Sequence, residues 1–125
     1  MTGASRGIGA AAARALERAG ARVALSARSS QGLEAVAATL ENDPIVLPAD
    51  LSDVNGPAEL ARAAIEKFGH VDVLVNNAAM AARLDTVDTD AALIDKMLAV
   101  NVRAPLLLIA ALVPSMAARG RGSIN

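Results

Sequence analysis

Apolar residues recur along this chain at two spacings, one typical of helices and the other typical of strands. Three segments carry apolar residues three or four positions apart, as one face of a helix does. These predicted helices cover residues 8–19, 33–40 and 60–68. Short, almost continuous apolar runs predict strands. The predicted strands cover residues 22–27, 45–49 and 71–75. A further apolar segment predicts a long helix that Thr89 caps and that ends near Ala118.

The alternation of predicted strands and helices indicates an α/β fold with a parallel sheet and helices on both faces. Strands of such a sheet are buried on both sides, which explains why their sequences are apolar almost throughout. Gly20 and Gly69 end two of the predicted helices, as glycine often does after the last helical residue. The sequence therefore predicts one Rossmann-type, doubly wound parallel sheet in a single domain over residues 1–125.

Three glycines, Gly3, Gly7 and Gly9, stand directly before the first predicted helix. Glycine lets the backbone turn sharply and approach a phosphate group closely, because it has no Cβ. The N–H groups and the positive end of the helix dipole then point at the phosphates. The segment predicts a loop that binds the pyrophosphate of a dinucleotide. Such a loop is a weak signal by itself, so the prediction needs support from residues later in the chain.

The strand that should precede this loop is the missing part of the pattern. A dinucleotide-binding loop follows a hydrophobic strand, and only Met1 and Thr2 precede Gly3 here. We therefore expect the central strand of the sheet to be absent. Residues 122–125 have the pattern of a further strand at its entry. We interpret the chain as an internal piece of a longer protein, incomplete at both ends and inactive on its own.

Composition and charge narrow the classes of function. The chain is 54% apolar, has Phe68 as its one aromatic residue, and has no cysteine or tyrosine. The lack of cysteine excludes a disulfide scaffold and a thiolate metal site, and it fits a cytoplasmic protein. The formal net charge is −1 with acids and bases interspersed, so we expect no metal and no nucleic-acid or membrane partner. The most apolar stretch, residues 104–113, is much shorter than a membrane span.

Arg28 occupies a position where a site for NAD usually has an acid. It follows the first predicted strand, where Asp or Glu would bond the ribose hydroxyls about 20 residues past the loop. No carboxylate lies between Glu17 and Glu34. The guanidinium groups of Arg28 and of Arg6, inside the loop, suit a 2′-phosphate, which an acid would repel. We interpret the pair as a preference for NADP over NAD; the alternative is that both are ordinary surface arginines.

Two more polar positions follow predicted strands. Asp50 ends the second strand, whose carboxyl end would line the ligand crevice, so its carboxylate could accept a hydrogen bond from an adenine amino group. A turn or helix-capping acid is an equally open alternative. Asn76 and Asn77, followed by Ala78 and Ala79, come after the third strand. The amides could link strands across the crevice while the alanines leave room for a flat ring, and a bare turn is the alternative.

Asn101 combines a polar side chain with an irregular helix. At helical spacing it shares a face with Met97, Ala104 and Leu108, so its amide is expected to point toward apolar surroundings and to need a partner. Pro105 has no N–H, so the carbonyl of Asn101 loses its helical donor. We predict a kink with a free carbonyl that binds a water; a purely structural kink is the alternative.

In this order and spacing, the motifs TGASRGIG, VNNAA and Asn101-Val102, with Arg28 and with Asp50 before Leu51, closely resemble the short-chain dehydrogenase/reductase family. The closest likeness is to its classical 3-oxoacyl-carrier-protein reductase-like members. The resemblance covers essentially the whole chain and implies a partial NAD(P)-binding Rossmann domain over residues 1–125. It implies that the cofactor phosphates are bound by Gly3, Ser5, Arg6, Gly7, Ile8 and Gly9.

The same resemblance assigns the other site residues. It implies that Arg28 binds the 2′-phosphate and that Asp50 and Leu51 bind the adenine. The adenosine ribose and the centre of the sheet are assigned to Asn77, Ala78 and Ala79. Asn101 would match the asparagine of the family's catalytic tetrad, whose carbonyl holds a water in a proton relay.

Two departures from the family pattern stand out. Ala79 replaces the glycine of the usual NNAG motif, and the added methyl group is expected to tighten the cofactor pocket slightly. The family's catalytic serine and its YxxxK pair would lie beyond Asn125, and Ser123 comes too early to be that serine. His70, the one histidine, follows Gly69 at a helix end and is interpreted as a solvated loop residue.

The resemblance implies an NADP(H)-dependent oxidoreductase that moves hydride between nicotinamide and a small-molecule carbonyl or alcohol, in a parent protein that forms homo-oligomers. A non-catalytic nucleotide-binding or scaffold protein of the same fold is the alternative. A methyltransferase with a similar sheet is less favoured, because that fold also needs an acid at the ribose and none stands near Arg28.

Overall fold

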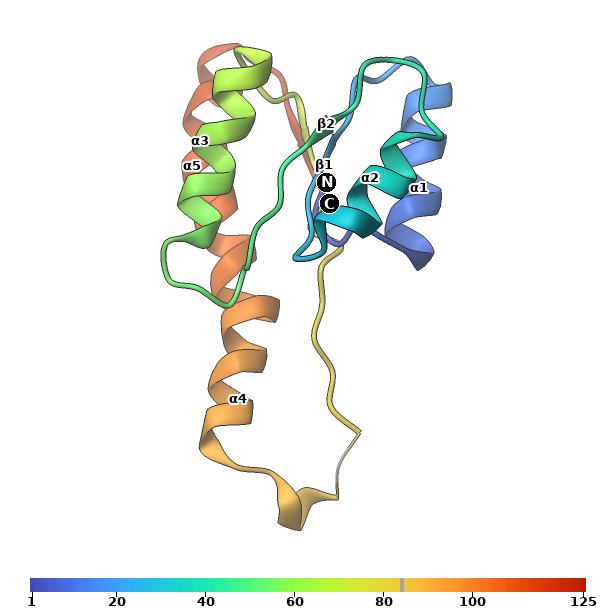
Figure 1. The fold of residues 1–125 in the computed structure, drawn as a ribbon. Helices are drawn as coiled ribbons and strands as arrows, with labels where there is room; N and C mark the ends of the chain where they lie inside the picture. Colours follow the sequence, from blue (N-terminus) through green and yellow to red (C-terminus); the bar gives the residue numbers. More distant parts are fainter. Residues whose placement is uncertain (84) are drawn as a thin grey trace.

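The computed structural model describes residues 1–83 and 85–125, in which strands and helices alternate along the chain (Figure 1). The first half contains α1 (Gly7–Arg18), β1 (Ala24–Leu25), α2 (Ser30–Ala37), β2 (Ile45–Val46) and α3 (Gly56–Phe68). The second half contains β3 (Val73–Leu74), the 3-10 helix η1 (Thr86–Asp88), α4 (Ala91–Leu98), the π-helix η2 (Ala99–Arg103), α5 (Ala104–Ala118) and β4 (Ser123–Ile124). Each predicted strand contains an observed one, and the strand entry predicted at residues 122–125 contains β4.

All strand pairs are parallel, as the alternation predicts. Ala24 of β1 lies opposite Ile45 of β2, and Val73 of β3 lies opposite Ser123 of β4. The assigned strands are short, but the hydrogen bonds between β1 and β2 extend further, from Ile45 N to Val23 O through Ala49 N to Ala27 O.

No central strand is assigned before the glycine loop in the described part of the chain, as expected, and Met1 and Thr2 alone link the two strand pairs. Thr2 bridges Ser26 in parallel, and its N–H donates to Val75 O at 3.0 Å. On the other side, Ser26 N–H donates to Met1 O at 2.9 Å. The strand order is therefore β2, β1, the Met1–Thr2 segment, β3 and β4. The link to β3 is a single backbone hydrogen bond, so the two residues bridge the strand pairs without forming a full central strand.

A cavity of about 60 Å³ lies beside Met1, between the sheet and the helices α3 and α5. Most of its walls are apolar side chains, such as Leu60 of α3, Leu74 of β3 and Leu108 of α5, and Thr2 and Ser26 also line it. Packing in protein interiors is normally close, so an apolar space of this size weakens the contacts of its lining residues. Hydrogen bonds thus link the two strand pairs, but the apolar side chains beneath the centre of the sheet are less closely packed.

Helices cover both faces of the sheet, with α1 and α2 on one side and α3 and α5 on the other (Figure 1). Each side has its own apolar core. The first core consists of Ala4, Ala10, Ala13, Val23, Leu25, Leu33, Val36 and Leu40. The second consists of Leu51, Leu60, Ala61, Leu74, Ala104, Leu108, Leu112 and Met116. This arrangement confirms the predicted doubly wound fold in its incomplete form.

The buried face of α1 differs from the predicted one. Ile8 is 81% exposed, whereas Gly9, Ala10 and Ala13 face the interior. The reason is the close packing of α1 on the loop before it, which admits only small residues on the inner face. A larger apolar side chain at this helix start is therefore placed on the outside, at the carboxyl end of the sheet.

The long helix predicted from Thr89 to Ala118 exists as three consecutive pieces, α4, η2 and α5. Its cap is Asp90, whose Oδ1 accepts the N–H of Leu93 at 2.7 Å, rather than Thr89. The predicted irregularity before Pro105 takes the form of the five-residue π-helix, in which Ala104 N–H donates to Ala99 O. The extra residue places Ala104 and Leu108 in the core but leaves Asn101 exposed.

Together these pieces make a helix of 28 residues, Ala91–Ala118, that is long and apolar enough to cross a membrane by length and composition alone. This is longer than the stretch 104–113 considered from the sequence. Leu108, Leu112 and Met116 pack in the second core, whereas Leu106 and Leu107 of the same helix are exposed. Helices that serve as core elements of folded domains commonly have this composition.

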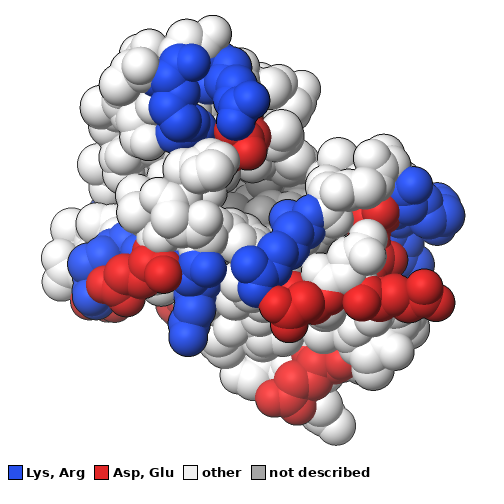
Figure 2. Space-filling model, turned by 90° about the horizontal axis from the view of Figure 1, so that it is seen from above, with Lys and Arg blue, Asp and Glu red and all other residues white. Residues whose placement is uncertain are grey.

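The face of the molecule seen in Figure 2 carries acidic and basic side chains interspersed with one another. Among the described residues, Asp72 Oδ1 forms ion pairs with Arg119 at 3.4 Å and Arg121 at 3.7 Å, and Asp72 Oδ2 lies 3.2 Å from His70 Nε2. His70 is therefore a surface residue paired with a neighbouring acid. These exposed pairs contribute little stability individually.

The α-amino group of Met1 makes the stability of the 125-residue chain depend on pH. It donates to Ala24 O at 2.8 Å, and burial lowers its pKa from 8.0 to about 6. The unfolded chain therefore binds this proton more strongly between pH 6 and pH 8. We expect the free energy of unfolding to rise by about 2 kcal/mol from this group across that interval and to level off beyond it. Urea unfolding over this range measures the slope.

The matched control is the same chain with an acetylated amino terminus. Acetylation retains an N–H donor but removes the titration, so the rise attributed to Met1 should disappear. Equal slopes in the two chains would contradict the assignment.

Candidate functional site

The glycine loop of residues 3–9 has a backbone that other residues would not fit. Gly3 has φ +65° and Gly7 has φ +56°, both in the region that favours glycine. A Cβ on Gly3 would lie 2.8 Å from Asn77 Nδ2, and a Cβ on Gly9 would lie 2.0 Å from Gly3 O. The loop therefore packs so closely on α1 and on the segment after β3 that only glycine fits at positions 3 and 9.

Asn77 and Thr2 fasten this loop to the segment after β3. The Nδ2 group of Asn77 donates to Thr2 O and to Gly3 O, both at 3.2 Å. In return, Thr2 Oγ1 accepts the N–H groups of Asn77 at 3.1 Å and Ala78 at 3.0 Å. A bare turn at residues 76–79 is thus excluded. The Asn77 side chain contacts the loop, and the predicted ribose contact remains a prediction.

Sequence analysis missed the role of Thr2. Its hydroxyl is buried, also donates to Val75 O at 3.3 Å, and joins three backbone groups that lie more than 70 residues away in the chain. Its position directly before the glycine loop is the one local signal that could have indicated it. No spacing rule identifies the partners, because they come from another strand.

The start of α1 has no side-chain cap. Arg6 is the N-cap residue in an extended conformation, and the first turn contains no acidic residue. The free N–H groups of this turn, with the positive end of the helix dipole, are suited to bind an anion. Ser5 lies beside them in the same loop. Arg6 is exposed at this end of the helix, as is Ile8.

Arg28 is exposed immediately after the carboxyl end of β1, as the sequence predicts. Within residues 1–83 and 85–125, neither Arg28 nor Arg6 forms an ion pair with an acidic side chain. Both guanidinium groups are therefore available to an added anion. This arrangement agrees with a phosphate-binding role and does not by itself distinguish it from that of ordinary surface arginines.

Asp50 forms a turn with Ser52. Its Oδ1 accepts the N–H of Ser52 at 2.9 Å and the hydroxyl of Ser52 at 2.7 Å. These hydrogen bonds lower the pKa of Asp50, and the positive charges of Arg28 and Lys96 act in the same direction. The turn interpretation is therefore observed, and a contact with adenine through the remaining carboxylate oxygen stays a prediction. The neighbouring Leu51 is buried in the second core.

Asn101 lies in the π-helix and bonds the backbone of the segment after β3. Its Oδ1 accepts the N–H of Met80 at 2.8 Å, and its Nδ2 donates to Met80 O at 2.7 Å. The amide thus has a partner, as predicted, but its surroundings are exposed rather than apolar, because η2 shifts the helical register by one residue. The water on the Asn101 carbonyl remains a prediction.

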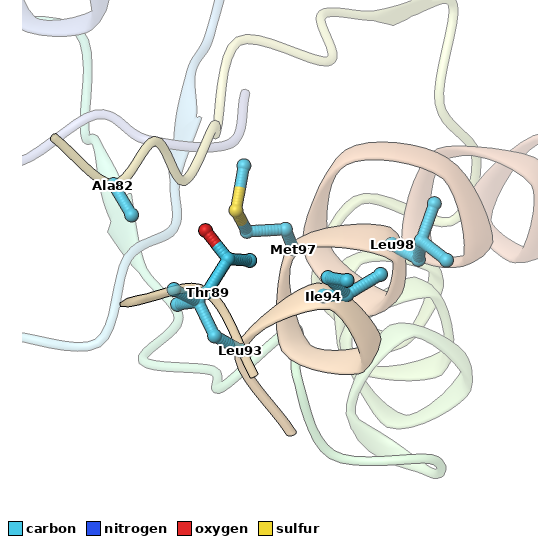
Figure 3. A pocket seen from close by; sticks show the side chains of 6 residues that line it. All are labelled: Ala82, Thr89, Leu93, Ile94, Met97 and Leu98. Atoms are coloured by element: carbon cyan, nitrogen blue, oxygen red, sulfur yellow. The ribbon is translucent and has the colours of Figure 1, made fainter. Parts of the chain in front are cut away.

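An apolar pocket of about 300 Å³ lies next to this segment (Figure 3). Its walls come from α4 and from the chain before it. They are formed by Ala82, Thr89, Leu93, Ile94, Met97 and Leu98. None of the predicted cofactor residues lines it. Among the described residues, no three His, Asp or Glu side chains come close enough to bind a metal ion.

The geometry of the loop, the strand order and the Asn101 contact can be compared with known proteins. The sequence profile of the family described as short chain dehydrogenase matches residues 1–124. The chain belongs to this family. The resemblance seen in the sequence is thereby confirmed at the family level, while the narrower likeness to 3-oxoacyl-carrier-protein reductases stays a prediction.

Relatives and solved structures of short-chain dehydrogenases align over nearly the whole chain. It is 37% identical over 131 residues to a dehydrogenase/reductase SDR family protein 7-like of Drosophila melanogaster, covering 99% of this chain and 40% of the relative. It is 39% identical over 129 residues to dehydrogenase/reductase SDR family member 4 of Bos taurus, covering 99% and 46%.

Two similar solved structures contain a cofactor. A metagenomic short-chain oxidoreductase in complex with NADP is 41% identical, with a TM-score of 0.91, over 98% of this chain and 57% of that chain. A short-chain dehydrogenase from Sphingobium yanoikuyae in complex with NADPH is 33% identical, with a TM-score of 0.89, over 99% and 50%. The chain thus spans about half the length of the short-chain dehydrogenases it matches.

Proposed function

We propose that this chain is the cofactor-binding part of an NADP(H)-dependent oxidoreductase that transfers hydride to or from the carbonyl or alcohol carbon of a small molecule. The observation that carries the proposal is the glycine loop, which Asn77 and Thr2 hold against the uncapped start of α1. Family membership supports it, and so do the NADP and NADPH in the two similar structures.

The residues of this chain fit a dinucleotide. The close approach of Gly3 and Gly9 leaves no room for side chains where the loop turns, and the first N–H groups of α1 have no side-chain partner. We infer that residues 3–9 hold the pyrophosphate, that Arg6 and Arg28 pair with the 2′-phosphate, and that Asp50 and Leu51 contact the adenine. Ala78 and Ala79, held behind the loop, would face the ribose.

Bound nicotinamide supplies or accepts the hydride. We infer that this chain orients the cofactor and takes part in proton transfer. The amide of Asn101 fixes the π-helix to Met80, and we infer that its carbonyl holds the water that passes a proton toward the reaction site. The chain has no tyrosine, so the family's proton-donating tyrosine and its lysine would come from sequence outside these 125 residues.

A second candidate function is a nucleotide-binding protein of the same fold without catalysis, because the loop contacts account for cofactor binding and not for the chemical step. The two candidates differ in one measurement. The complete protein containing this chain should oxidise NADPH in the presence of a ketone if it is an oxidoreductase. It should bind NADPH without turnover if it is a binding protein.

The arginine pair predicts the choice between the two cofactors. In the complete protein, Arg28→Asp should weaken NADPH binding by about 1–3 kcal/mol and reverse or remove the preference over NADH, because a charge-assisted pair becomes a repulsion. Titration calorimetry with both cofactors measures this. Arg62→Asp on α3, outside the loop, serves as the matched control and should leave the preference unchanged. An unaltered protein that already prefers NADH would contradict the prediction.

A further inference from the structure

The π-helix η2 sends two side chains to two different loops at the carboxyl end of the sheet. Asn101 bonds both backbone groups of Met80, in the segment after β3. Arg103, two residues later, donates from Nη2 to Ser52 O at 2.7 Å, in the loop after β2. One turn of helix therefore contacts the loops on both sides of the proposed crevice.

The loop reached by Arg103 is a compact unit, which we call the Asp50 turn (residues 50–53). Asp50 Oδ1 accepts both donors of Ser52, and Asp53 N–H donates to Asp50 O at 3.2 Å. Gly56 packs so closely behind it that a Cβ there would lie 2.1 Å from Asp50 O. A turn closed in this way moves as one piece, so a single contact can set its position.

Arg103 makes that contact. Of the hydrogen bonds within the described part of the chain, the one from Arg103 is the only side-chain bond that reaches the Asp50 turn from another element. The acceptor, Ser52 O, is a backbone carbonyl. The bond therefore fixes the position of the backbone in this turn rather than the rotamer of a side chain. A guanidinium donor strengthens such a bond relative to a neutral one.

The helix segment that carries Asn101 and Arg103 is anchored by buried residues at both ends. Ala99 and Ala104, at the two ends of the segment that carries Asn101 and Arg103, are 5% and 0% exposed. Ala104 belongs to the second core together with Leu51, the residue that follows Asp50. The Asp50 turn and the helix segment that carries Asn101 are therefore both anchored in the same packed core.

We propose that Arg103 is a positioning residue that sets the Asp50 turn relative to Asn101, so that one turn of helix aligns the adenine end of the cofactor with the reaction end. This inference rests on the proposed function, because it needs the Asp50 turn to contact the adenine. Arg103 itself touches no reacting atom. Its effect is expected on cofactor binding rather than on the chemical step.

The test compares Arg103→Met, which keeps the aliphatic stem but has no donor, with Arg103→Lys, which keeps a charged donor. In the complete protein, Arg103→Met should raise the KM for NADPH about tenfold with kcat changed by less than about twofold. Arg103→Lys should recover most of the loss. Arg62→Met is the matched control: Arg62 is also exposed but pairs with Glu66 on α3, away from the crevice, and the substitution should change neither constant.

Hydrogen exchange of the cofactor-free protein supplies a second readout. Arg103→Met should speed exchange of the amides of Ser52 and Asp53 with no change in the core of α1, whereas Arg62→Met should not. Unchanged exchange at both amides would overturn the proposal, and so would faster exchange with an unchanged KM for NADPH. If the unaltered protein binds no NADPH, the proposed function fails and the positioning role with it; the exchange result then still shows separately whether Arg103 holds the turn.

Discussion

Replacing Gly9 with alanine is expected to weaken NADPH binding at least about a hundredfold and to destabilise the fold by about 3 kcal/mol. The new Cβ would lie 2.0 Å from Gly3 O and 2.7 Å from Asn77 Nδ2. Both neighbours hold the glycine loop, so the loop must move away from α1, and the proposed phosphate contacts are then misplaced. Titration calorimetry with NADPH and urea unfolding measure the two effects.

Gly69→Ala is the matched control for this change. Gly69 has φ +79° at the end of α3, and a Cβ there would meet nothing within 4 Å. The substitution should cost about 1 kcal/mol of stability for the backbone conformation alone, and NADPH affinity should stay as in the unaltered protein. Equal losses of affinity in both variants would show that the close packing of the loop has no special role in binding.

The second large effect is expected for Asn101→Leu, which should lower kcat at least about tenfold in the complete protein while the KM for NADPH stays nearly constant. Leucine cannot bond Met80, so the π-helix loses its connection to the segment after β3. The two backbone groups that lose their partner lie near the surface, where water can replace the amide, so the loss of stability should stay below about 1 kcal/mol. Steady-state kinetics and thermal unfolding measure both.

Asn55→Leu is the control at a comparable exposed position. Asn55 precedes α3, and its side chain makes no capping hydrogen bond. Its turnover should match that of the unaltered protein. If Asn101→Leu reduced stability and activity in proportion, the structural interpretation of the irregular helix would be preferred over an active-site role.

Much of the fold and of the candidate site could be predicted from local patterns. Apolar spacing located α1, α2, α3 and the strands β1, β2 and β3, because burial of one face or of both faces imposes its period on the sequence. The structural effects of the loop glycines and of Pro105 could also be predicted, because glycine allows conformations closed to other residues and proline has no N–H to donate. Arg28 was found because the position after a strand is defined by the strand itself.

Contacts between distant segments could not be predicted in this way. Thr2 bonds residues near position 77, Asn101 bonds Met80, and Arg103 bonds Ser52. No local period records such pairs, because each depends on how the strands are ordered and on the register of the helix that faces them. The π-helix illustrates this dependence, since one extra residue turned Asn101 from the predicted apolar face to the surface.

The sequence by itself thus determined the alternation of strands and helices, the parallel sheet, the glycine loop and the family, because these depend on local geometry and on motifs. The tertiary structure decided which side chains hold that loop, how two residues at the start of the chain join both halves of the sheet, and why Ile8 lies outside. Packing and hydrogen bonds across the sheet select among faces and partners that local sequence leaves equivalent, and for that reason only the folded chain shows them.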